Sequence, residues 1–316
     1  MSGRYPFPAY PNGWFRVAYS RELAVGEVKA LRCLGRDLVL YRDEEGAAHV
    51  LDAFCAHLGA HLGVGGRVEG RSLRCPFHHW LWGADGRCVE IPYARRIPPN
   101  ASIRVWPVDE KNGIVFLWHH DRDAAPGYAL PELPQVGRAG WAPLEIRRWK
   151  VRARWLDMNE NAVDRVHFRY VHGTQNIPDS EAEIDGHVLR VRNKVRFPTP
   201  RGVVDGTLDT TDYGPGLQTV ELAGIVETLM INTSTPIDED YTDTSFAYTV
   251  HDEGDERTAH GVGAALIRDL EKQMGEDIPI WENKAYWTRP VLCDGDGSIG
   301  IYRRWMRQFF SEEIGR

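Results

Sequence analysis

Short segments in which apolar and polar residues alternate dominate residues 1–120. They are rich in β-branched and aromatic residues, and turn-forming stretches at residues 43–46 and 84–86 separate some of them. Alternation with frequent turns is typical of the strands of a small all-β domain. The pattern predicts strands at residues 14–18, 37–41, 49–51, 103–108 and 114–118.

Residues 121–316 carry a mixed pattern. Long runs with few helix breakers predict three helices, at residues 155–171, 264–287 and 299–310. Alternating β-branched segments predict strands within residues 188–197 and 216–230, with a loop at residues 198–206 between them. Strands combined with long helices favour an α+β domain in which a sheet wraps around a helix.

A stretch rich in proline, glycine and acidic residues, residues 121–134, is the best candidate for a linker. We therefore expect two domains, residues 1–120 and residues 121–316. Two acidic patches, residues 238–240 and 252–256, are expected to be solvated loops.

Composition and charge narrow the class of protein. The 316 residues, 42% of them hydrophobic, suffice for two ordinary cores, and the net charge of −7 argues against general nucleic-acid binding. No apolar run approaches the roughly 20 residues of a membrane span, and the first residues lack the apolar core of an export signal. Five cysteines make no disulfide framework in a chain this long, so Cys33, Cys88 and Cys293 are expected to be reduced. We expect a soluble, cytoplasmic protein.

Two pairs of cysteine and histidine stand close together in the first domain. They are Cys55-Ala56-His57 and Cys75-Pro76-Phe77-His78, which together supply two thiolates and two imidazoles. A Rieske-type [2Fe–2S] cluster needs this set, with two cysteines on one iron and two histidines on the other. The alternatives are a zinc site, for which Cys-x-His is too tight a spacing, and buried cysteines with incidental histidines. The spacing favours the iron–sulfur cluster over both.

A second group of candidate ligands lies in the predicted helix at residues 155–171. Asp164 and His167 are three residues apart and share a helix face. His167 and His172 are five apart, so on an ideal helix they diverge by roughly 140°. They converge on one metal only if the helix ends or widens between them, and Gly173 could help to end it. Taken alone, the two histidines fit a structural role better than a metal site, but the iron–sulfur motif in the same chain reverses that balance.

These motifs resemble those of the Rieske non-haem iron oxygenases, whose cluster loops match residues 54–60 and 75–80 almost residue for residue. The resemblance implies an N-terminal Rieske domain followed by an α+β helix-grip catalytic domain. It assigns the cluster to Cys55, His57, Cys75 and His78. It assigns a mononuclear Fe(II) to His167, His172 and one carboxylate. Asp164 matches the aspartate that bridges the two centres. Most members have glycine where His79 stands, so a ligand exchange between the adjacent histidines His78 and His79 stays open.

The third iron ligand should be a carboxylate further along the chain. Asp277 aligns with the ligand aspartate of these oxygenases, which precedes a run like Ile278-Pro279-Ile280-Trp281. Glu276 is the obvious competitor and Glu282 a more distant one. The remaining alternative is an ordinary acidic helix surface.

The C-terminal block narrows the resemblance to one branch. Residues 281–284, 290–297 and 303–310 look like the branch that holds 3-ketosteroid 9α-hydroxylases and cholesterol 7-desaturases. This implies an oxygenase component that uses O2 and electrons to hydroxylate or desaturate an apolar steroid-, sterol- or terpenoid-like substrate. Two alternatives remain: an O- or N-demethylase or hydroxylase of an aromatic or alkaloid substrate, and a Rieske electron-transfer protein without mononuclear iron.

The chain offers no nicotinamide or flavin motif, because Gly261-Val262-Gly263 lacks the third glycine and the strand context. Electrons should therefore come from a separate NAD(P)H-dependent flavin reductase, with or without a ferredoxin. Between residues 55 and 96, arginine outnumbers acidic residues, which should attract an acidic redox partner; the residues are Arg67, Arg71, Arg74, Arg87, Arg95 and Arg96 against Glu69, Asp85 and Glu90. The resemblance also implies a homotrimeric ring in which Asp164 of one chain meets His78 of the next.

Overall fold

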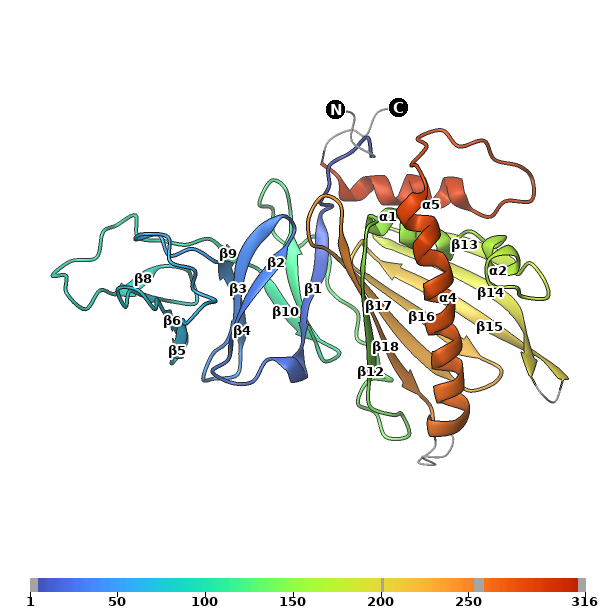
Figure 1. Cartoon of the computed structure of the whole chain (residues 1–316), viewed down its shortest axis with the longest axis horizontal. Coiled ribbons are helices and arrows are strands. Elements are labelled where there is room, and N and C mark those ends of the chain that lie inside the picture. Colours follow the sequence, from blue (N-terminus) through green and yellow to red (C-terminus); the bar gives the residue numbers. More distant parts are fainter. Residues whose placement is uncertain (1–4, 200–201, 253–258, 312–316) are drawn as a thin grey trace.

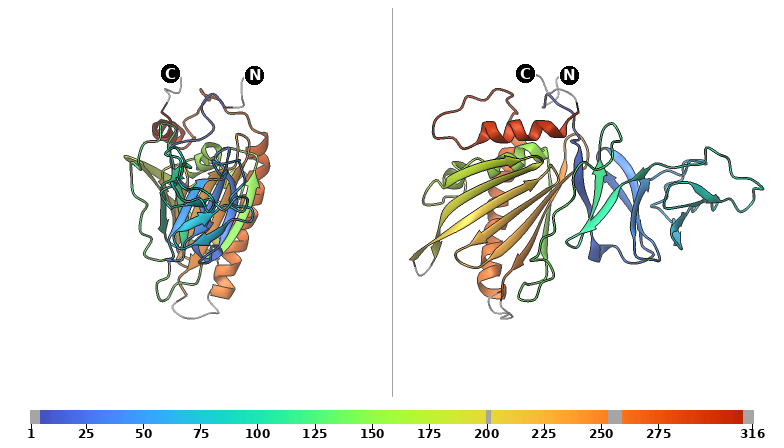
Figure 2. Two further views of the ribbon diagram at one scale, coloured as in Figure 1. Left: turned by 90° about the vertical axis from the view of Figure 1, so that its left-hand side faces the viewer. Right: turned by 180° about the vertical axis from the view of Figure 1, so that it is seen from behind.

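The computed structural model describes residues 5–199, 202–252 and 259–311. The molecule is elongated, with small β-sheets at one end and a large sheet crossed by a long helix at the other (Figures 1 and 2). The fold class expected from the sequence, an all-β N-terminal part followed by an α+β part, is confirmed.

Two small antiparallel sheets form the middle of the molecule. One has the order β1-β11-β10 and the other β2-β3-β4-β9. Buried apolar side chains such as Phe15, Leu38 and Leu117 form one core cluster from both sheets. Their strands are β1 (Gly13–Tyr19), β2 (Val28–Cys33), β3 (Arg36–Arg42), β4 (Ala48–Asp52), β9 (Val105–Trp106), β10 (Val108–Lys111) and β11 (Ile114–His119).

The predicted strands in this part are confirmed with one exception. Residues 103–108 do not form one strand, because β9 ends at Trp106 and β10 begins at Val108 in another sheet. Pro107 separates them, and a proline has no N–H to give to a strand ladder.

A third small sheet forms the outer tip. It contains β5 (Arg67–Glu69), β6 (Ser72–Arg74), β7 (Leu81–Trp82) and β8 (Cys88–Glu90) in sequence order. A compact cluster that includes Leu73, Trp80 and Trp82 fills its core. This tip carries both cysteine–histidine motifs, at the end of the molecule away from the large sheet (Figure 1).

The rest of the chain builds one seven-stranded antiparallel sheet in the order β12-β18-β17-β16-β15-β14-β13. Helix α4 (Ala264–Asn283) crosses one face of it (Figure 1). The helix buries Ile267, Leu270, Met274 and Trp281, whose spacing places them on one side. The strands are β12 (Glu145–Val151), β13 (Asp179–Asp185), β14 (Val188–Thr199), β15 (Gly202–Tyr213), β16 (Leu217–Ala223), β17 (Thr228–Pro236) and β18 (Thr242–Val250).

The helix predicted at residues 155–171 is wrong as one element. It is divided into α1 (Trp155–Asn159), the 3-10 turn η2 (Glu160–Ala162) and α2 (His167–Tyr170). The break has a local cause. Asp164 Oδ1 accepts hydrogen bonds from the backbone N–H groups of Val166 (3.1 Å) and His167 (3.3 Å). A short acidic side chain that binds nearby backbone in this way competes with a continuous helix and starts a new one.

Other expectations for this half are corrected in detail. The loop predicted at residues 198–206 is wrong, because β14 and β15 pair from Val188 with Tyr213 to Thr199 with Gly202. The segment 216–230 contains β16 and the start of β17, and the helix predicted to residue 287 ends at Asn283. The last predicted helix is α5 (Ile299–Met306) with the turn η4 (Arg307–Phe309).

The predicted linker, residues 121–134, has no regular structure but is packed in place, since Leu130 and Leu133 are buried. Residues 238–240 form the expected loop, whereas residues 253–256 of the second acidic patch lie outside the described residues. Within the described ranges, no helix is both long and apolar enough to cross a membrane. The cytoplasmic location stays a prediction.

Candidate metal centres

The first site lies on two short loops of the tip. In one, the Cys55 N–H donates to Ala60 O and the Gly59 N–H donates to Cys55 O, both at 2.9 Å. In the other, the Cys75 N–H donates to Trp80 O at 2.9 Å. Gly59 has a φ of +76°, a left-handed conformation that suits glycine. These bonds turn each loop back on itself, so each cysteine lies near the histidine that follows it.

The four predicted cluster ligands come together at this tip. Cys55 and Cys75 are buried neighbours, and the rings of His57 and His78 lie 4.7 Å apart at 73°. His57 also stacks on Trp80 at 4.6 Å, and its buried Nδ1 has no hydrogen-bond partner among the described residues. Burial raises the pKa of the Cys55 thiol to about 11, with Cys75 beside it. A pair of buried thiols on the same tip as an unpartnered imidazole nitrogen fits a [2Fe–2S] cluster with mixed ligands.

His79 is on the second loop, and no ring contact of its side chain with His57 or His78 is found among the described residues. Its side chain is exposed, and its φ of +60° is left-handed. Its carbonyl accepts a hydrogen bond from Arg74 at 2.7 Å, and Arg74 also binds Glu69 and Glu90. The backbone of His79 therefore helps to fix the conformation of the loop, and His78, not His79, lies beside His57.

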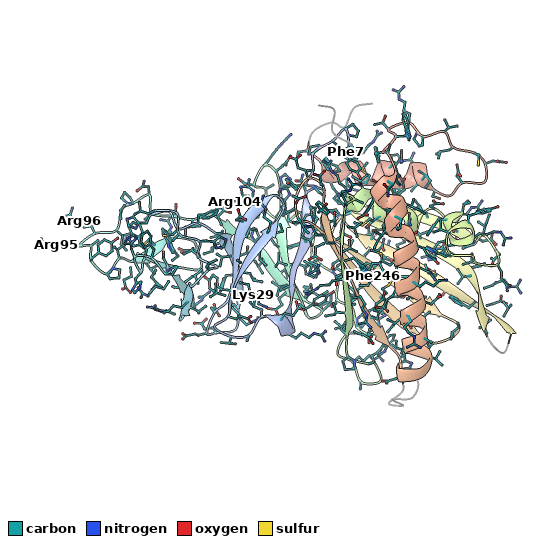
Figure 3. All side chains as sticks on the ribbon, viewed as in Figure 1. Phe7, Lys29, Arg95, Arg96, Arg104 and Phe246 are labelled. Atoms are coloured by element: carbon teal, nitrogen blue, oxygen red, sulfur yellow. The ribbon has the colours of Figure 1, made fainter. Side chains whose placement is uncertain are left out.

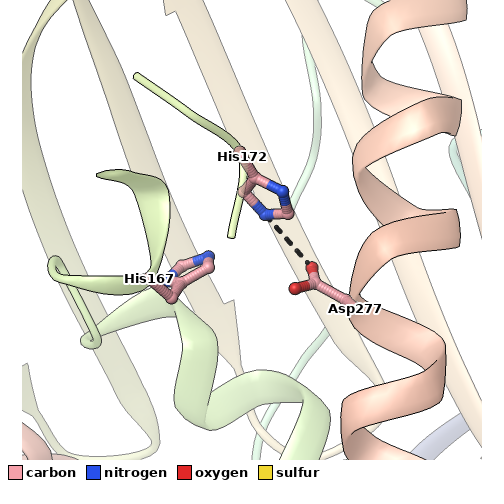
Figure 4. Close-up of side chains that lie close together, drawn as sticks. All are labelled: His167, His172 and Asp277. Atoms are coloured by element: carbon pink, nitrogen blue, oxygen red, sulfur yellow. Dashed lines mark ion pairs between the residues drawn. The ribbon is translucent and has the colours of Figure 1, made fainter. Parts of the chain in front are cut away.

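The second site lies between α2 and α4 (Figure 4). Helix α2 ends at Tyr170, the His172 N–H approaches His167 O at 3.4 Å, and Gly173 has a φ of +70°. The helix therefore ends between the two histidines, as convergence on one metal requires. Donor atoms of His167, His172 and Asp277 all lie within 4.8 Å of one another.

Both nitrogens of His172 face carboxylates on α4. Nε2 lies 3.4 Å from Asp277 Oδ2, and Nδ1 lies 3.0 Å from Glu276 Oε2. Although burial opposes it, Asp277 and Glu276 raise the pKa of His172. Glu276 therefore holds the nitrogen that points away from the three-donor group. The third competitor, Glu282, accepts a hydrogen bond from the Arg152 N–H at 3.0 Å and is not part of the group.

Asp164 lies three residues before His167, the first residue of α2. Its side chain binds the helix start, while its backbone carbonyl, not its carboxylate, contacts Nδ1 of His167. This contact leaves Nε2 of His167 for the shared centre, and burial lowers the pKa of His167. A neutral imidazole fixed through its other nitrogen is the form that binds a metal. The residues fit a 2-His-1-carboxylate iron site.

Comparisons with known proteins match both parts of the chain. Residues 13–107 match the Rieske [2Fe–2S] domain family, and residues 117–310 match the 3-ketosteroid 9α-hydroxylase C-terminal domain family. A probable 3-ketosteroid-9-alpha-monooxygenase oxygenase component from Rhodococcus rhodochrous is 34% identical, over 96% of this chain and 81% of that protein. Cholesterol 7-desaturase from Xenopus laevis is 31% identical, over 98% and 74%.

The chain belongs to the Rieske non-haem iron oxygenases. It is an oxidoreductase whose cofactors are a Rieske [2Fe–2S] cluster and a mononuclear iron. The alternative of a pure electron carrier is wrong, because the catalytic domain family covers residues 117–310. The boundary at residue 120 stays a prediction.

Solved structures of other Rieske oxygenases share this fold. Dicamba monooxygenase bound to 3,6-dichlorosalicylic acid superposes with a TM-score of 0.79 at 20% identity, over 97% of this chain and 99% of that one. Caffeine-bound NdmA from Pseudomonas putida gives 0.73 at 20% identity, over 93% and 89%. At this identity the likeness shows the fold alone, so it does not choose among hydroxylation, desaturation and demethylation.

The three-donor group of this Rieske oxygenase opens into a cavity between α4 and the sheet. The cavity measures about 130 Å³ and is lined mainly by apolar side chains, among them Val220, Met230, Phe246 and Trp281. A second cavity of about 170 Å³ adjoins it, since both are lined by Phe168, Leu208, Leu270 and Gln273. The combined volume of the two cavities is close to the lower end of the range of roughly 300–1,000 Å³ that is usual for small-molecule sites.

The sequence reasoning missed several polar residues of this cavity. Thr210, Gln218 and Asn232 line its sheet side. The available signal was a polar residue in a β-branched strand segment, at a position where alternation favours an inward-facing apolar one. This signal does not show that the three residues lie together in one cavity, because each of them is on a different strand.

Proposed function

We propose that this Rieske oxygenase oxidises an apolar, steroid- or sterol-like molecule in the cavity beside His167, His172 and Asp277. The observation that carries the proposal is the three-donor group at the wall of a cavity whose lining is mainly apolar. The names of the relatives support the substrate class, since one is called a 3-ketosteroid monooxygenase component and another a cholesterol desaturase. The apolar lining would hold such a substrate and exclude water.

Each candidate ligand has a defined task. Cys55, Cys75, His57 and His78 would hold the [2Fe–2S] cluster, and His167, His172 and Asp277 the iron. When bound, the cluster supplies single electrons and the iron activates O2 for oxidation of a C–H bond. Glu276 and the Asp164 carbonyl would fix the two imidazoles through their outer nitrogens, which sets the direction of the inner ones.

We further propose that the working enzyme is a head-to-tail ring, most simply a homotrimer. The tip with the cluster loops and α2 lie at opposite ends of the molecule (Figure 1), so one chain alone does not bring its two metal sites together. Exposed apolar side chains surround the cluster loops, namely Phe54, Leu58, Val64 and Phe77. Another exposed apolar set lies on α2, on α4 and on the loop after α4, namely Tyr170, Ile280, Trp287, Val291 and Leu292.

Two such apolar sets at opposite ends suit a heterologous contact, which closes as a ring when the rotation allows. In this arrangement Asp164 of one chain would meet His78 of the next and link the two centres.

As an oxygenase component, the chain depends on a separate protein for electrons. We propose a ferredoxin or a flavin reductase that docks at the tip through exposed arginines. Arg95 and Arg96 are exposed at the end farthest from the large sheet (Figure 3). Arg74 does not contribute to such a surface, because it is buried and paired with Glu69 and Glu90.

The proposal is tested by composition and by product. The purified protein should contain about three irons and two acid-labile sulfides per chain, as one [2Fe–2S] cluster plus one iron require. With a reducing partner and O2, a panel of steroids and sterols should give hydroxylated or desaturated products by mass spectrometry. Aromatic ethers and alkaloids in the same panel should not react. Iron-loaded protein that converts only the aromatic ethers would refute the substrate class.

A further inference from the structure

A row of polar side chains crosses the sheet beneath the cavity. Asp212 on β15 pairs across the sheet with Gln218 on β16, and Gln218 pairs with Asn232 on β17. Gln218 and Asn232 line the same cavity as His167, His172 and Asp277. The next partner of Asn232 along the row is Phe246, which also lines the cavity, so the row of hydrogen-bonding groups ends there.

The chemistry of Asp212 fixes the direction of the hydrogen bonds in this row. Asp212 is fully buried, and its Oδ1 lies 2.8 Å from Asn159 Nδ2 and 2.9 Å from Gln218 Nε2. Because this oxygen accepts, both amides must donate to it through their NH2 groups. Gln218 therefore presents its oxygen to its other neighbour. Asn232 Nδ2 donates to that oxygen at 2.8 Å.

One acceptor is left at the end of the row. Asn232 Oδ1 is buried and has no hydrogen-bond partner among the described residues. Burial raises the pKa of Asp212 to about 7. Protonation does not alter the direction of the row, because Oδ1 already accepts from two amides and the unpartnered Oδ2 is the oxygen that would take the proton. A buried acceptor without a donor raises the free energy of the folded protein, and a ligand that supplies a donor removes this penalty.

We infer that Asn232 Oδ1 accepts a hydrogen bond from a hydroxyl group of the substrate. The inference rests on the proposed function and narrows it to apolar alcohols, such as hydroxysteroids and sterols. A carbonyl at the same place would put two acceptors against each other, which a buried site rejects. The relatives' names cover both chemistries, since a 3-ketosteroid presents a carbonyl and cholesterol a hydroxyl.

The test measures binding of matched steroids to the iron-loaded holoenzyme without a reducing partner, so that no turnover occurs. The steroids carry a hydroxyl, a ketone or hydrogen at position 3 or position 17 on one skeleton. At one of these positions the hydroxyl compound should bind about tenfold more tightly than the ketone, as expected for one buried hydrogen bond replaced by a mismatch.

Two variants of the row and one control complete the design. Asn232→Leu should abolish the difference between alcohol and ketone. Gln218→Leu should free the Asn232 amide to rotate, so that ketone binding rises toward that of the alcohol. Thr219→Val changes a buried neighbour on β16 that does not line the cavity, and it should keep the preference. Visible absorption and iron content report whether each variant is folded.

The outcomes separate this inference from the proposed function. Equal binding of alcohol and ketone at both positions, or tighter binding of the ketone, overturns the recognition of a hydroxyl while the oxygenase remains. A preference that persists in Asn232→Leu overturns the role of this residue. If no steroid of the series binds to iron-loaded protein, the steroid-like substrate class falls together with the inference.

Discussion

The candidate cluster ligands lie on two neighbouring loops of the tip, whereas the candidate iron ligands come from α2, the turn after it and α4, which is far from them in the chain. Backbone hydrogen bonds inside each loop position Cys55 and Cys75. At the iron site a backbone hydrogen bond links His172 to His167, but Asp277 joins them only when α4 packs on the sheet through Leu270, Met274 and Trp281. One site is thus a local structure and the other a product of tertiary packing.

The two sites also differ in their surroundings. The cluster loops carry exposed apolar side chains and lie at the surface, as a group that exchanges electrons with another protein requires. The side chain of His172 is only 2% exposed, and its cavity lies between α4 and the sheet. Surface access would serve electron entry, and burial of the ligands beside a mainly apolar cavity would serve the proposed oxidation. The two sites should therefore fail independently when their ligands are changed.

The largest expected effects test this independence. Cys55→Ser should abolish the visible absorption of the Rieske cluster, because it removes a thiolate ligand. His167→Ala or His172→Ala should keep that absorption but abolish product formation, because the iron loses a ligand. Absorption spectra and product analysis of the same preparations check both halves. Normal turnover by both histidine variants would exclude this iron site.

Cys88→Ser is the matched control for the cluster variant. Cys88 is buried in the same core cluster as Cys55 and Cys75, but its Sγ lies 3.4 Å from the Glu90 carbonyl. We expect its absorption spectrum to match that of the unchanged protein.

Variants of the neighbouring residues Asp277 and Glu276 should distinguish the iron ligand from the residue that orients His172. Asp277→Ala should lose the mononuclear iron. Glu276→Ala should keep it with affinity lowered about 10–100-fold, which is typical for loss of a residue that orients a metal-binding histidine. Glu276→Gln should recover part of the affinity, because an amide can still bind His172 Nδ1. Iron titration checks all three, and the opposite pattern would transfer the ligand role to Glu276.

The difference between the sites also sets what the sequence could predict. The spacing of Cys55, His57, Cys75 and His78 is local, so the sequence alone sufficed to propose the cluster. The break in the helix at residues 155–171 was missed, because it depends on which way the Asp164 side chain bonds. The row from Asp212 to Asn232 was missed as well, because only the strand register brings these residues together.

Asp164→Asn tests whether the two sites meet between chains. Both metals and the assembly should be retained, because the side-chain Oδ1 that accepts from α2 is present in asparagine. Turnover coupled to the redox partner should fall by about 10–100-fold, as for the loss of a residue that links metal ligands. Metal content, solution mass and single-turnover rates are the measurements. A fully active monomer or an unchanged rate in Asp164→Asn would rule out the ring.

The rate of electron transfer should depend on salt through the exposed arginines at the tip, and not through charges on α4. Electron transfer from the partner should slow several-fold as ionic strength rises from about 0.05 to 0.5 M, because screening weakens attraction to the exposed arginines. Arg95→Gln with Arg96→Gln should be slow at low salt and nearly insensitive to it. Arg268→Gln, an exposed change on α4, is the control and should behave like the unchanged protein. Salt-independent transfer in the unchanged protein would refute this attraction.

The smallest effect concerns the shape of the second cluster loop. His79→Gly should stabilise the Rieske domain by about 0.5–1 kcal/mol, because glycine adopts the φ of +60° at this position without the steric cost that histidine has. Gly59→Ala is the matched opposite: its φ is +76° and its added Cβ would meet nothing within 4 Å, so only the backbone cost remains and the domain should lose about 1 kcal/mol. Thermal loss of the cluster absorption measures both. If His79→Gly instead loses the cluster at room temperature, His79 is a ligand and the assignment of His78 is wrong.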